Sequence, residues 1–193
     1  MNILATDLAV DTALPENKLV AELCVNLRHY LEQSQIDDVI RAFEYGRKAH
    51  QEQFRKSGEA YICHPLSVAL TLSEMRMDVN GIIAAILHDV IEDSPSTKED
   101  LAAAFNEEVA ELVDGVSKLG KIENKSKQES KAESVRKMIL AMAKDLRVIM
   151  VKLADRLHNM KTLGAMERRK QRLIARETLV IYVPLADRLG MND

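Results

Sequence analysis

Residues 80–93, NGIIAAILHDVIED, decide the fold. The first half of this segment is apolar nearly all round, and a helix of that kind is buried at the centre of a protein. The segment nevertheless ends with a histidine, two aspartates and a glutamate within six positions. Because burying an unpaired charge is costly, such a gathering needs a physical reason. The segment therefore predicts a central helix with a polar site at its C-terminal end.

The composition of the whole chain favours packed helices. Of the 193 residues, 47% are hydrophobic, whereas aromatic residues make up 4%, and there are 7 glycines and 4 prolines. Good helix formers such as Ala, Leu and Met are abundant. A chain of this length buries about 70% of the surface of its unfolded state, which is enough for a sizeable core. We expect an all-α protein with no split into two domains.

Charge and cysteine content narrow the classes of partner and location. The net charge of −3 argues against a broad basic surface for nucleic acid, so an anionic ligand must be met by local cations. No segment is long and apolar enough to suggest a membrane span. Cys24 and Cys63 are too few for a disulfide framework, and residues 1–18 lack the pattern of a signal peptide. We expect a cytoplasmic protein.

Helical patterns precede the central segment. Apolar residues recur at helical spacing over residues 17–33 and 36–54. Another helix is expected to start near Cys63, with Pro65 in its first position, where the missing N–H costs nothing. Residues 1–16 are expected to form an N-terminal tail.

Helical patterns also follow the central segment. Thr97 and Asp100 form an approximate capping box for a short helix, which an amphipathic helix follows over residues 106–119. Residues 121–134 lose their hydrophobes and are expected to form a mobile loop. Two long helices complete the chain; we expect a break near residues 144–145 in the first and a bend at a proline, residue 184, in the second.

The polar groups at the end of the central segment suggest a metal ion. On a helix, Glu92 stacks over His88 and Asp93 over Asp89. A divalent cation would give these groups a partner in a buried setting. The alternative is that the helix merely reaches the surface at this end.

Two further candidates lie on other helices. Asp155 interrupts an apolar helical pattern and has Asn159 one turn later on the same face; at the surface it could instead pair with Arg156 or Lys152. His64 stands at a helix N-terminus, where it could equally be a cap. Together, His, His-Asp and Asp on three helices supply a mixed nitrogen and oxygen site that favours manganese, iron or zinc over calcium.

Five stretches resemble the N-terminal hydrolase region of the RelA/SpoT homologues, HD-superfamily enzymes that make and degrade the alarmones guanosine tetra- and pentaphosphate, (p)ppGpp. They read RKSGEAYICHPLSVA (55–69), AAILHDVIEDS (84–94), LVDGVSKLGK (112–121), RKMILAMAKDLRVIMVKLADRLHNMKTL (136–163) and RETLVIYVPLADRLG (176–190). The resemblance covers about residues 35 to 190. It implies an HD-type helical bundle with one metal site.

The resemblance also implies roles for individual residues. The family's metal ligands correspond to His64, His88, Asp89 and Asp155, and its usual metal is manganese, with other divalent ions as alternatives. Its catalytic acidic pair corresponds to Glu92 and Asp93, whereas members that only synthesise the alarmone have lost these motifs.

By the same resemblance, the residues that would contact the nucleotide are Arg55, Lys56, Ser57, Asn159 and Thr162. A guanidinium can stack on a base or form paired hydrogen bonds with phosphate, and a lysine adds a point charge. On composition alone, Arg55 and Lys56 would instead belong to a solvated loop.

We therefore expect metal-dependent hydrolysis of the 3′-diphosphate of (p)ppGpp, giving GDP or GTP and pyrophosphate. Two alternatives stay open: an HD phosphohydrolase of another nucleotide, and a non-catalytic alarmone-binding module. We expect residues 17–193 to form the hydrolase domain, taken from a longer chain that also contains synthetase and regulatory domains.

Overall fold

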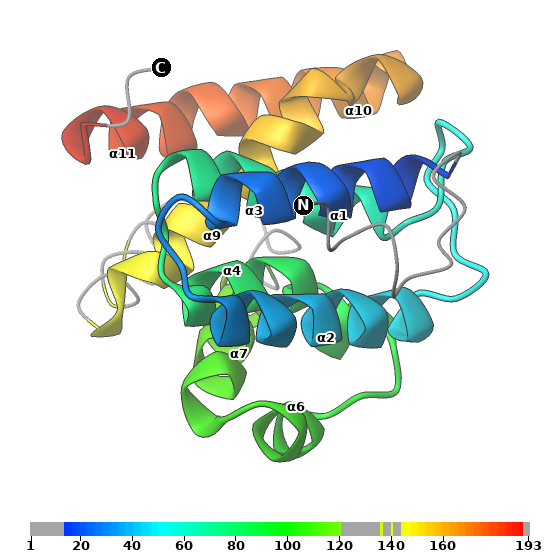
Figure 1. Ribbon diagram of the computed structural model, residues 1–193. Coiled ribbons are helices and arrows are strands. Elements are labelled where there is room, and N and C mark those ends of the chain that lie inside the picture. Colours follow the sequence, from blue (N-terminus) through cyan, green and yellow to red (C-terminus); the bar gives the residue numbers. More distant parts are fainter. Residues whose placement is uncertain (1–13, 121–135, 137–139, 141–143, 191–193) are drawn as a thin grey trace.

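The computed structural model describes residues 14–120, 136, 140 and 144–190, and within them it is helical (Figure 1). The α-helices are α1 (Pro15–Leu27), α2 (Gln33–Ala49), α3 (Cys63–Glu74), α4 (Val79–Leu87), α5 (Val90–Asp93), α6 (Lys98–Ala104), α7 (Glu107–Gly120), α9 (Leu146–Lys161), α10 (Arg168–Glu177) and α11 (Val183–Arg188). A 3-10 turn, η3 (Leu163–Ala165), follows α9, and a π-helical turn, η4 (Thr178–Tyr182), joins α10 to α11. The described residues contain no strand, only an isolated bridge between Phe54 and Ala60. The all-α prediction is confirmed.

Helix α4 lies at the centre of the bundle. It packs against α2, α3, α7 and α9, and Figure 1 shows it between α3 and α2. All of its residues from Gly81 to Leu87 are buried. The apolar sequence is therefore explained by burial on every side, as expected for the central helix.

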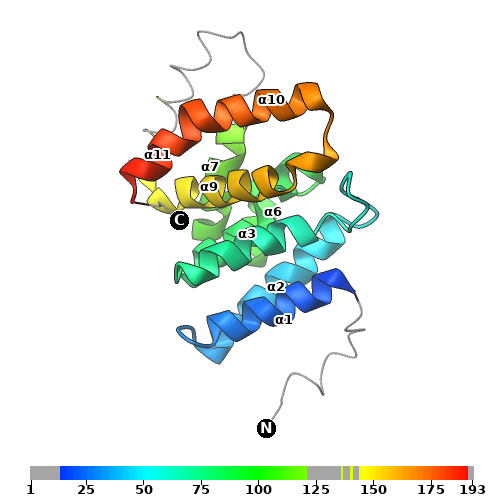
Figure 2. The ribbon, with the colours of Figure 1, turned by 90° about the horizontal axis from the view of Figure 1, so that it is seen from above.

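The remaining helices form successive rows around α4. Seen from above, α1, α3, α9 and the α10–α11 segment run side by side across the molecule (Figure 2). The α10–α11 segment is fixed to α9 by Arg156, which pairs with Glu177 at 3.1 Å and lies over the ring of Tyr182. Helix α9 thus has α3 and α4 on one side and the C-terminal helices on the other.

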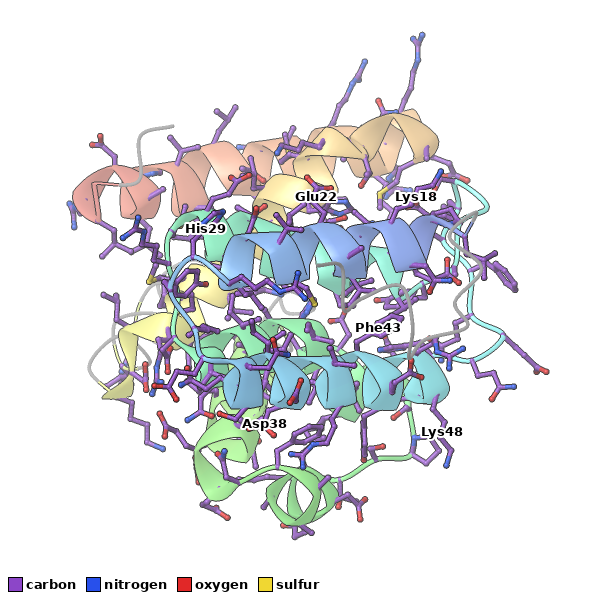
Figure 3. The ribbon with its side chains drawn as sticks, viewed as in Figure 1. Lys18, Glu22, His29, Asp38, Phe43 and Lys48 are labelled. Carbon is purple, nitrogen blue, oxygen red and sulfur yellow. The ribbon has the colours of Figure 1, made fainter. Side chains whose placement is uncertain are left out.

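Helix α2 shows the amphipathic character expected from its sequence. In Figure 3, Phe43 points toward α1 and is buried, whereas Asp38 and Lys48 lie on the opposite, solvent-exposed side. The helix ends at Ala49, earlier than the expected boundary at residue 54. Glu52 has φ 66, a left-handed conformation that an α-helix does not accommodate, so the chain turns there.

Several other boundaries differ from the sequence prediction. α1 starts at Pro15, inside the expected tail, and α3 starts at Cys63, so that Pro65 is its third residue. Proline is tolerated there because the first turn of a helix has no N–H partners. Near Pro184 the irregularity lies in the preceding π turn, because proline offers no N–H to the carbonyl one turn before it.

Two further expectations concern how helices begin, and the structure confirms both. The capping box at α6 is confirmed, since Thr97 and Asp100 each accept a hydrogen bond from the other's backbone N–H. α9 begins directly after Asp145, so the expected break is also confirmed. The predicted loop over residues 121–134 lies outside the described residues. In the described parts of the chain, every helix falls short of the length and apolarity that a membrane span requires.

Candidate functional site

Two histidines and an aspartate meet in the core between α3, α4 and α9. His64 is the second residue of α3, His88 directly follows α4, and Asp155 lies in α9. All three are buried, and one ligand atom from each lies within 4.8 Å of the other two. Nε2 of His64 is 3.2 Å from Oδ1 of Asp155, and Nε2 of His88 is 4.0 Å from the same oxygen.

Asp89 brings a second carboxylate to this cluster. Its Oδ2 lies 3.2 Å from Nε2 of His88 and 3.8 Å from Nε2 of His64. The structure thus brings together all four residues that the sequence singled out as ligands. Two imidazole nitrogens and two carboxylates form a donor set suited to a divalent transition metal.

The hydrogen bonding of His88 fits a bound cation. Its Nδ1 lies 2.8 Å from the carbonyl oxygen of Ala85, so the proton of a neutral ring would sit on Nδ1. Its Nε2 is buried and has no hydrogen-bond partner, although the carboxylate of Asp89 is close. A buried nitrogen without such a partner is costly unless another group takes its lone pair. A divalent ion in the cluster would do so.

The pKa values show that the cluster favours positive charge. Burial lowers the pKa of His88, but the carboxylates of Asp89 and Asp155 outweigh this effect and raise it to about 9. Burial would raise the pKa of Asp155, yet the charge of Lys152 and the neighbouring imidazoles hold it well below its usual range. The site therefore keeps its carboxylates ionised and attracts a cation, either a proton or a metal ion.

Two neighbouring residues hold the carboxylates in place. The hydroxyl of Tyr61 lies 2.8 Å from Oδ2 of Asp89, and Nζ of Lys152 donates to Oδ2 of Asp155 at 2.9 Å. Lys152 was expected as a possible partner of Asp155 at the surface, and the structure forms this pair although Asp155 is buried. Tyr61 lies in the segment between α2 and α3, where no periodic pattern points to it.

The predicted nucleotide contacts lie beside this cluster. Nη2 of Arg55 donates to Oδ1 of Asn159 at 3.0 Å and lies 3.4 Å from Oγ1 of Thr162. Arg55 stands in a tight turn, closed by Gly58 with φ 90 and held by a hydrogen bond from its N–H to the carbonyl of Glu59. The turn presents the guanidinium to the C-terminal half of α9.

Lys56 and Ser57 lie apart from these contacts. Both are exposed at the tip of the turn, and the hydroxyl of Ser57 donates to Oε1 of Glu59 at 3.3 Å. Of the five residues expected to contact nucleotide, the structure joins Arg55 to two, while Lys56 and Ser57 remain in solvent.

The acidic pair Glu92 and Asp93 lies at the outer edge of the site. The expected continuous helix is interrupted here: Asp89, with φ −95 and ψ −7, separates α4 from α5, so the predicted stacking over His88 and Asp89 is not that of one regular helix. Asp93 stays linked to the cluster, because the hydroxyl of Tyr61 lies 3.1 Å from its Oδ2. Partial burial, together with the nearby charge of Asp89, raises the pKa of Glu92.

Comparison with known proteins identifies the family. The model of the HD domain family matches residues 42–192. The chain belongs to the HD-domain family. The resemblance to the RelA/SpoT homologues is confirmed as well, since this HD domain is 53% identical over 166 residues to the bifunctional (p)ppGpp synthase/hydrolase SpoT of Escherichia coli K12.

Two other proteins are similar to this HD domain. A guanosine-3′,5′-bis(diphosphate) 3′-pyrophosphohydrolase of Vibrio cholerae is 55% identical over 166 residues, which cover 86% of this chain and 24% of that protein. A solved structure of a metazoan ortholog of SpoT, described as hydrolysing ppGpp, is 28% identical with a TM-score of 0.55 and covers 74% of this chain and 80% of that one. The match to SpoT has the same coverage as the Vibrio match, so the chain spans about a quarter of the length of these curated relatives.

Proposed function

We propose that this HD domain hydrolyses guanosine tetra- and pentaphosphate at the 3′ position, releasing pyrophosphate and leaving GDP or GTP. One observation carries the proposal: the contacts of Arg55 with Asn159 adjoin the buried group of His64, His88 and Asp155, so a nucleotide and a divalent ion would be held side by side. The names of the similar proteins support the same substrate.

We infer that His64, His88, Asp89 and Asp155 hold the ion and that it is manganese, with other divalent metals as alternatives. Such an ion would supply Lewis acidity: it would lower the pKa of water, so that hydroxide is available near neutral pH, and it would polarise a phosphoryl oxygen. The chain contributes a rigid donor set whose carboxylates are already fixed by Tyr61 and Lys152.

Glu92 and Asp93 are the proposed acid and base. Hydrolysis joins the oxygen of water to the phosphorus on the 3′ oxygen and breaks the bond between that phosphorus and the 3′ oxygen. One carboxylate accepts the proton that water loses, and a carboxylic acid returns a proton to the departing 3′ oxygen. The raised pKa of Glu92, caused first by burial, suits this exchange, because an acid–base group works best when its pKa approaches the working pH.

Arg55, Lys56, Ser57, Asn159 and Thr162 are the proposed nucleotide contacts. The guanidinium of Arg55 would stack on the base or pair with phosphate, and Lys56 would add charge from the exposed turn. Holding the nucleotide in this way removes the freedom that the uncatalysed reaction must overcome. We further propose that residues 17–193 act as one hydrolase unit in the cytoplasm, within a longer chain that carries synthetase and regulatory domains.

The decisive experiment incubates the purified chain with MnCl2 and ppGpp and measures pyrophosphate and GDP. We expect both products in equal amounts, and neither after treatment with EDTA. GTP and dGTP serve as competing substrates. Intact ppGpp in the presence of folded, manganese-loaded protein would refute the proposal. Faster release of pyrophosphate from GTP or dGTP than from ppGpp would assign the domain to another nucleotide.

A further inference from the structure

His158 in α9 lies against a predicted metal ligand without belonging to the ligand cluster. Its Nδ1 is 2.8 Å from Nδ1 of His64, on the side of that ring that faces away from Asp155. Nη1 of Arg55 approaches the same atom at 3.4 Å. One ring nitrogen of His158 therefore stands between a residue of the metal cluster and a residue of the nucleotide site.

These distances, together with what a metal ligand requires, indicate where the protons lie. Two imidazole nitrogens 2.8 Å apart form a hydrogen bond, so one of them carries the proton and the other accepts. Nε2 of His64 points at the carboxylates of the cluster and must be free of a proton to bind an ion. Neutral His64 then carries its proton on Nδ1, and this N–H donates a hydrogen bond to Nδ1 of His158. The approach of Arg55, which can only donate, agrees with an acceptor at that atom.

We propose that His158 is a positioning residue of the metal site: its Nδ1 accepts a hydrogen bond from Nδ1–H of His64 and so fixes the tautomer and ring orientation of His64. Without this acceptor, the N–H of His64 would be buried and unpaired, and the alternative tautomer would put a proton on the nitrogen that must bind the ion. The inference rests on the metal site of the proposed function and adds a residue to it.

The other histidine of the cluster provides a comparison. Nδ1 of His88 is held by the backbone carbonyl of Ala85, a group that no substitution removes. At His64 the same task falls to a side chain. The orientation of His64 can therefore be tested by mutation, whereas that of His88 cannot.

Three substitutions separate hydrogen bonding from packing. His158→Leu keeps a side chain of similar bulk and removes the acceptor. His158→Asn places a carbonyl oxygen near the position of Nδ1, whereas His158→Gln places it farther out, near the position of Nε2. His29→Leu, at an exposed histidine just after the end of α1, is the control for loss of an ordinary imidazole.

Metal binding is measured by titrating MnCl2 into nucleotide-free protein in a calorimeter, with the melting temperature as a check on folding. Loss of an outer partner of a ligand typically weakens metal binding about 10- to 100-fold, and we expect this for His158→Leu and His158→Gln. His158→Asn and His29→Leu should bind close to the wild type. Nitrogen NMR of the metal-free protein should show His64 protonated on Nδ1 in the wild type and as a mixture of tautomers in His158→Leu.

The outcomes are distinct. Wild-type affinity in His158→Leu, with His64 still protonated on Nδ1, would overturn the role of His158. If His158→Leu fails to fold, equal affinities of His158→Asn and His158→Gln would overturn it. If the wild type itself binds no manganese, the proposed metal fails, and the tautomer of His64 in the metal-free variants still decides the inference about His158.

Discussion

The side-chain amide of Asn159 donates to Oδ1 of Asp155 at 2.6 Å. Its carbonyl oxygen accepts from the guanidinium of Arg55 at 3.0 Å. One amide therefore joins the predicted metal cluster to the predicted nucleotide contacts, and its two hydrogen bonds fix which way it points.

Replacing Asn159 should weaken both sides of the site. Asn159→Ala removes the acceptor for Arg55 and the donor to Asp155, and hydrogen bonds to charged groups are worth about 1.5–3 kcal/mol. We expect a fall in affinity of about tenfold or more for a non-hydrolysable (p)ppGpp analogue, measured by calorimetry, with weaker manganese binding as well. Asn80→Ala, at a solvent-exposed contact with Glu108, is the control. Undiminished analogue binding by Asn159→Ala would contradict the assignment of Arg55 and Asn159 to the nucleotide.

Asp89→Ala should abolish metal binding and hydrolysis together. The substitution removes a charged donor and leaves three others around an ion that they hold less tightly. Metal content of the purified variant, measured by elemental analysis, is the first readout, and pyrophosphate release is the second. Asp38→Ala changes a half-exposed carboxylate of α2, far from the cluster in sequence, and should retain both properties. Full occupancy by manganese in Asp89→Ala would place the ion elsewhere.

The double substitution Glu92→Gln with Asp93→Asn tests the proposed acid and base. The amides preserve shape and hydrogen bonding but cannot exchange the proton. Because such groups contribute about 10²- to 10⁴-fold in rate, turnover should fall by at least that order while manganese and nucleotide still bind. If these side chains serve only the stability of α5, the melting temperature would drop and turnover would persist, which would remove both residues from the mechanism.

Stability should depend on pH through Asp145, which caps α9. Hydrogen bonds from Arg147 hold the pKa of Asp145 below its ordinary value. Because the folded pKa is the lower one, this contribution is complete above about pH 4, the unfolded value, and is lost as the pH falls through the folded value. Asp145→Asn should cost about 1 kcal/mol at pH 7 and less at pH 3, measured by urea unfolding. Asp38→Asn controls for general charge effects, and an equal cost at both pH values would exclude the ionic contribution.

Gly115 permits close packing of α7 on α9. A Cβ at this position would lie 3.0 Å from Cγ2 of Val148, whereas one at Gly164 would meet open space. Alanine favours a helix by about 1 kcal/mol over glycine, but overpacking costs about 1–3 kcal/mol. Gly115→Ala should therefore lower the melting temperature, and adding Val148→Ala should recover part of the loss. Gly164→Ala is the control, and a stabilised Gly115→Ala would show that α9 yields easily.

The sequence predicted those elements whose signals are local. The central helix followed from unbroken apolar residues, and a break was expected near residues 144–145, where the structure shows Asp145 capping α9. A break near Gly58 was expected, but the end of α2 and the shape of the turn that presents Arg55 were not, because these depend on single backbone conformations at Glu52 and Gly58. A period of 3.6 residues carries no information about such turns.

For the candidate site, the sequence singled out the ligand residues and named Lys152 as a possible partner of Asp155, but it did not point to His158 or Tyr61. Lys152 and His158 lie three residues before and after Asp155, and this spacing places them on neighbouring sides of one helix face. Tyr61 reaches Asp89 only because α3 folds back against α4, which is a tertiary contact. Individual hydrogen bonds of this kind depend on the tertiary structure, which the local sequence pattern does not specify.

Helix α9 carries Asp155 at one end of the site and Thr162 just past its last turn, with Asn159 between them. The spacing of Asn159 and Thr162 from Asp155 is therefore set by helical rise, about 1.5 Å per residue. α9 would therefore act as a ruler between the ion and the part of the nucleotide that Asn159 and Thr162 contact. Adapting the site to a longer or shorter nucleotide would require side chains of different reach, because insertion of a single residue would rotate half of the site away by about 100°.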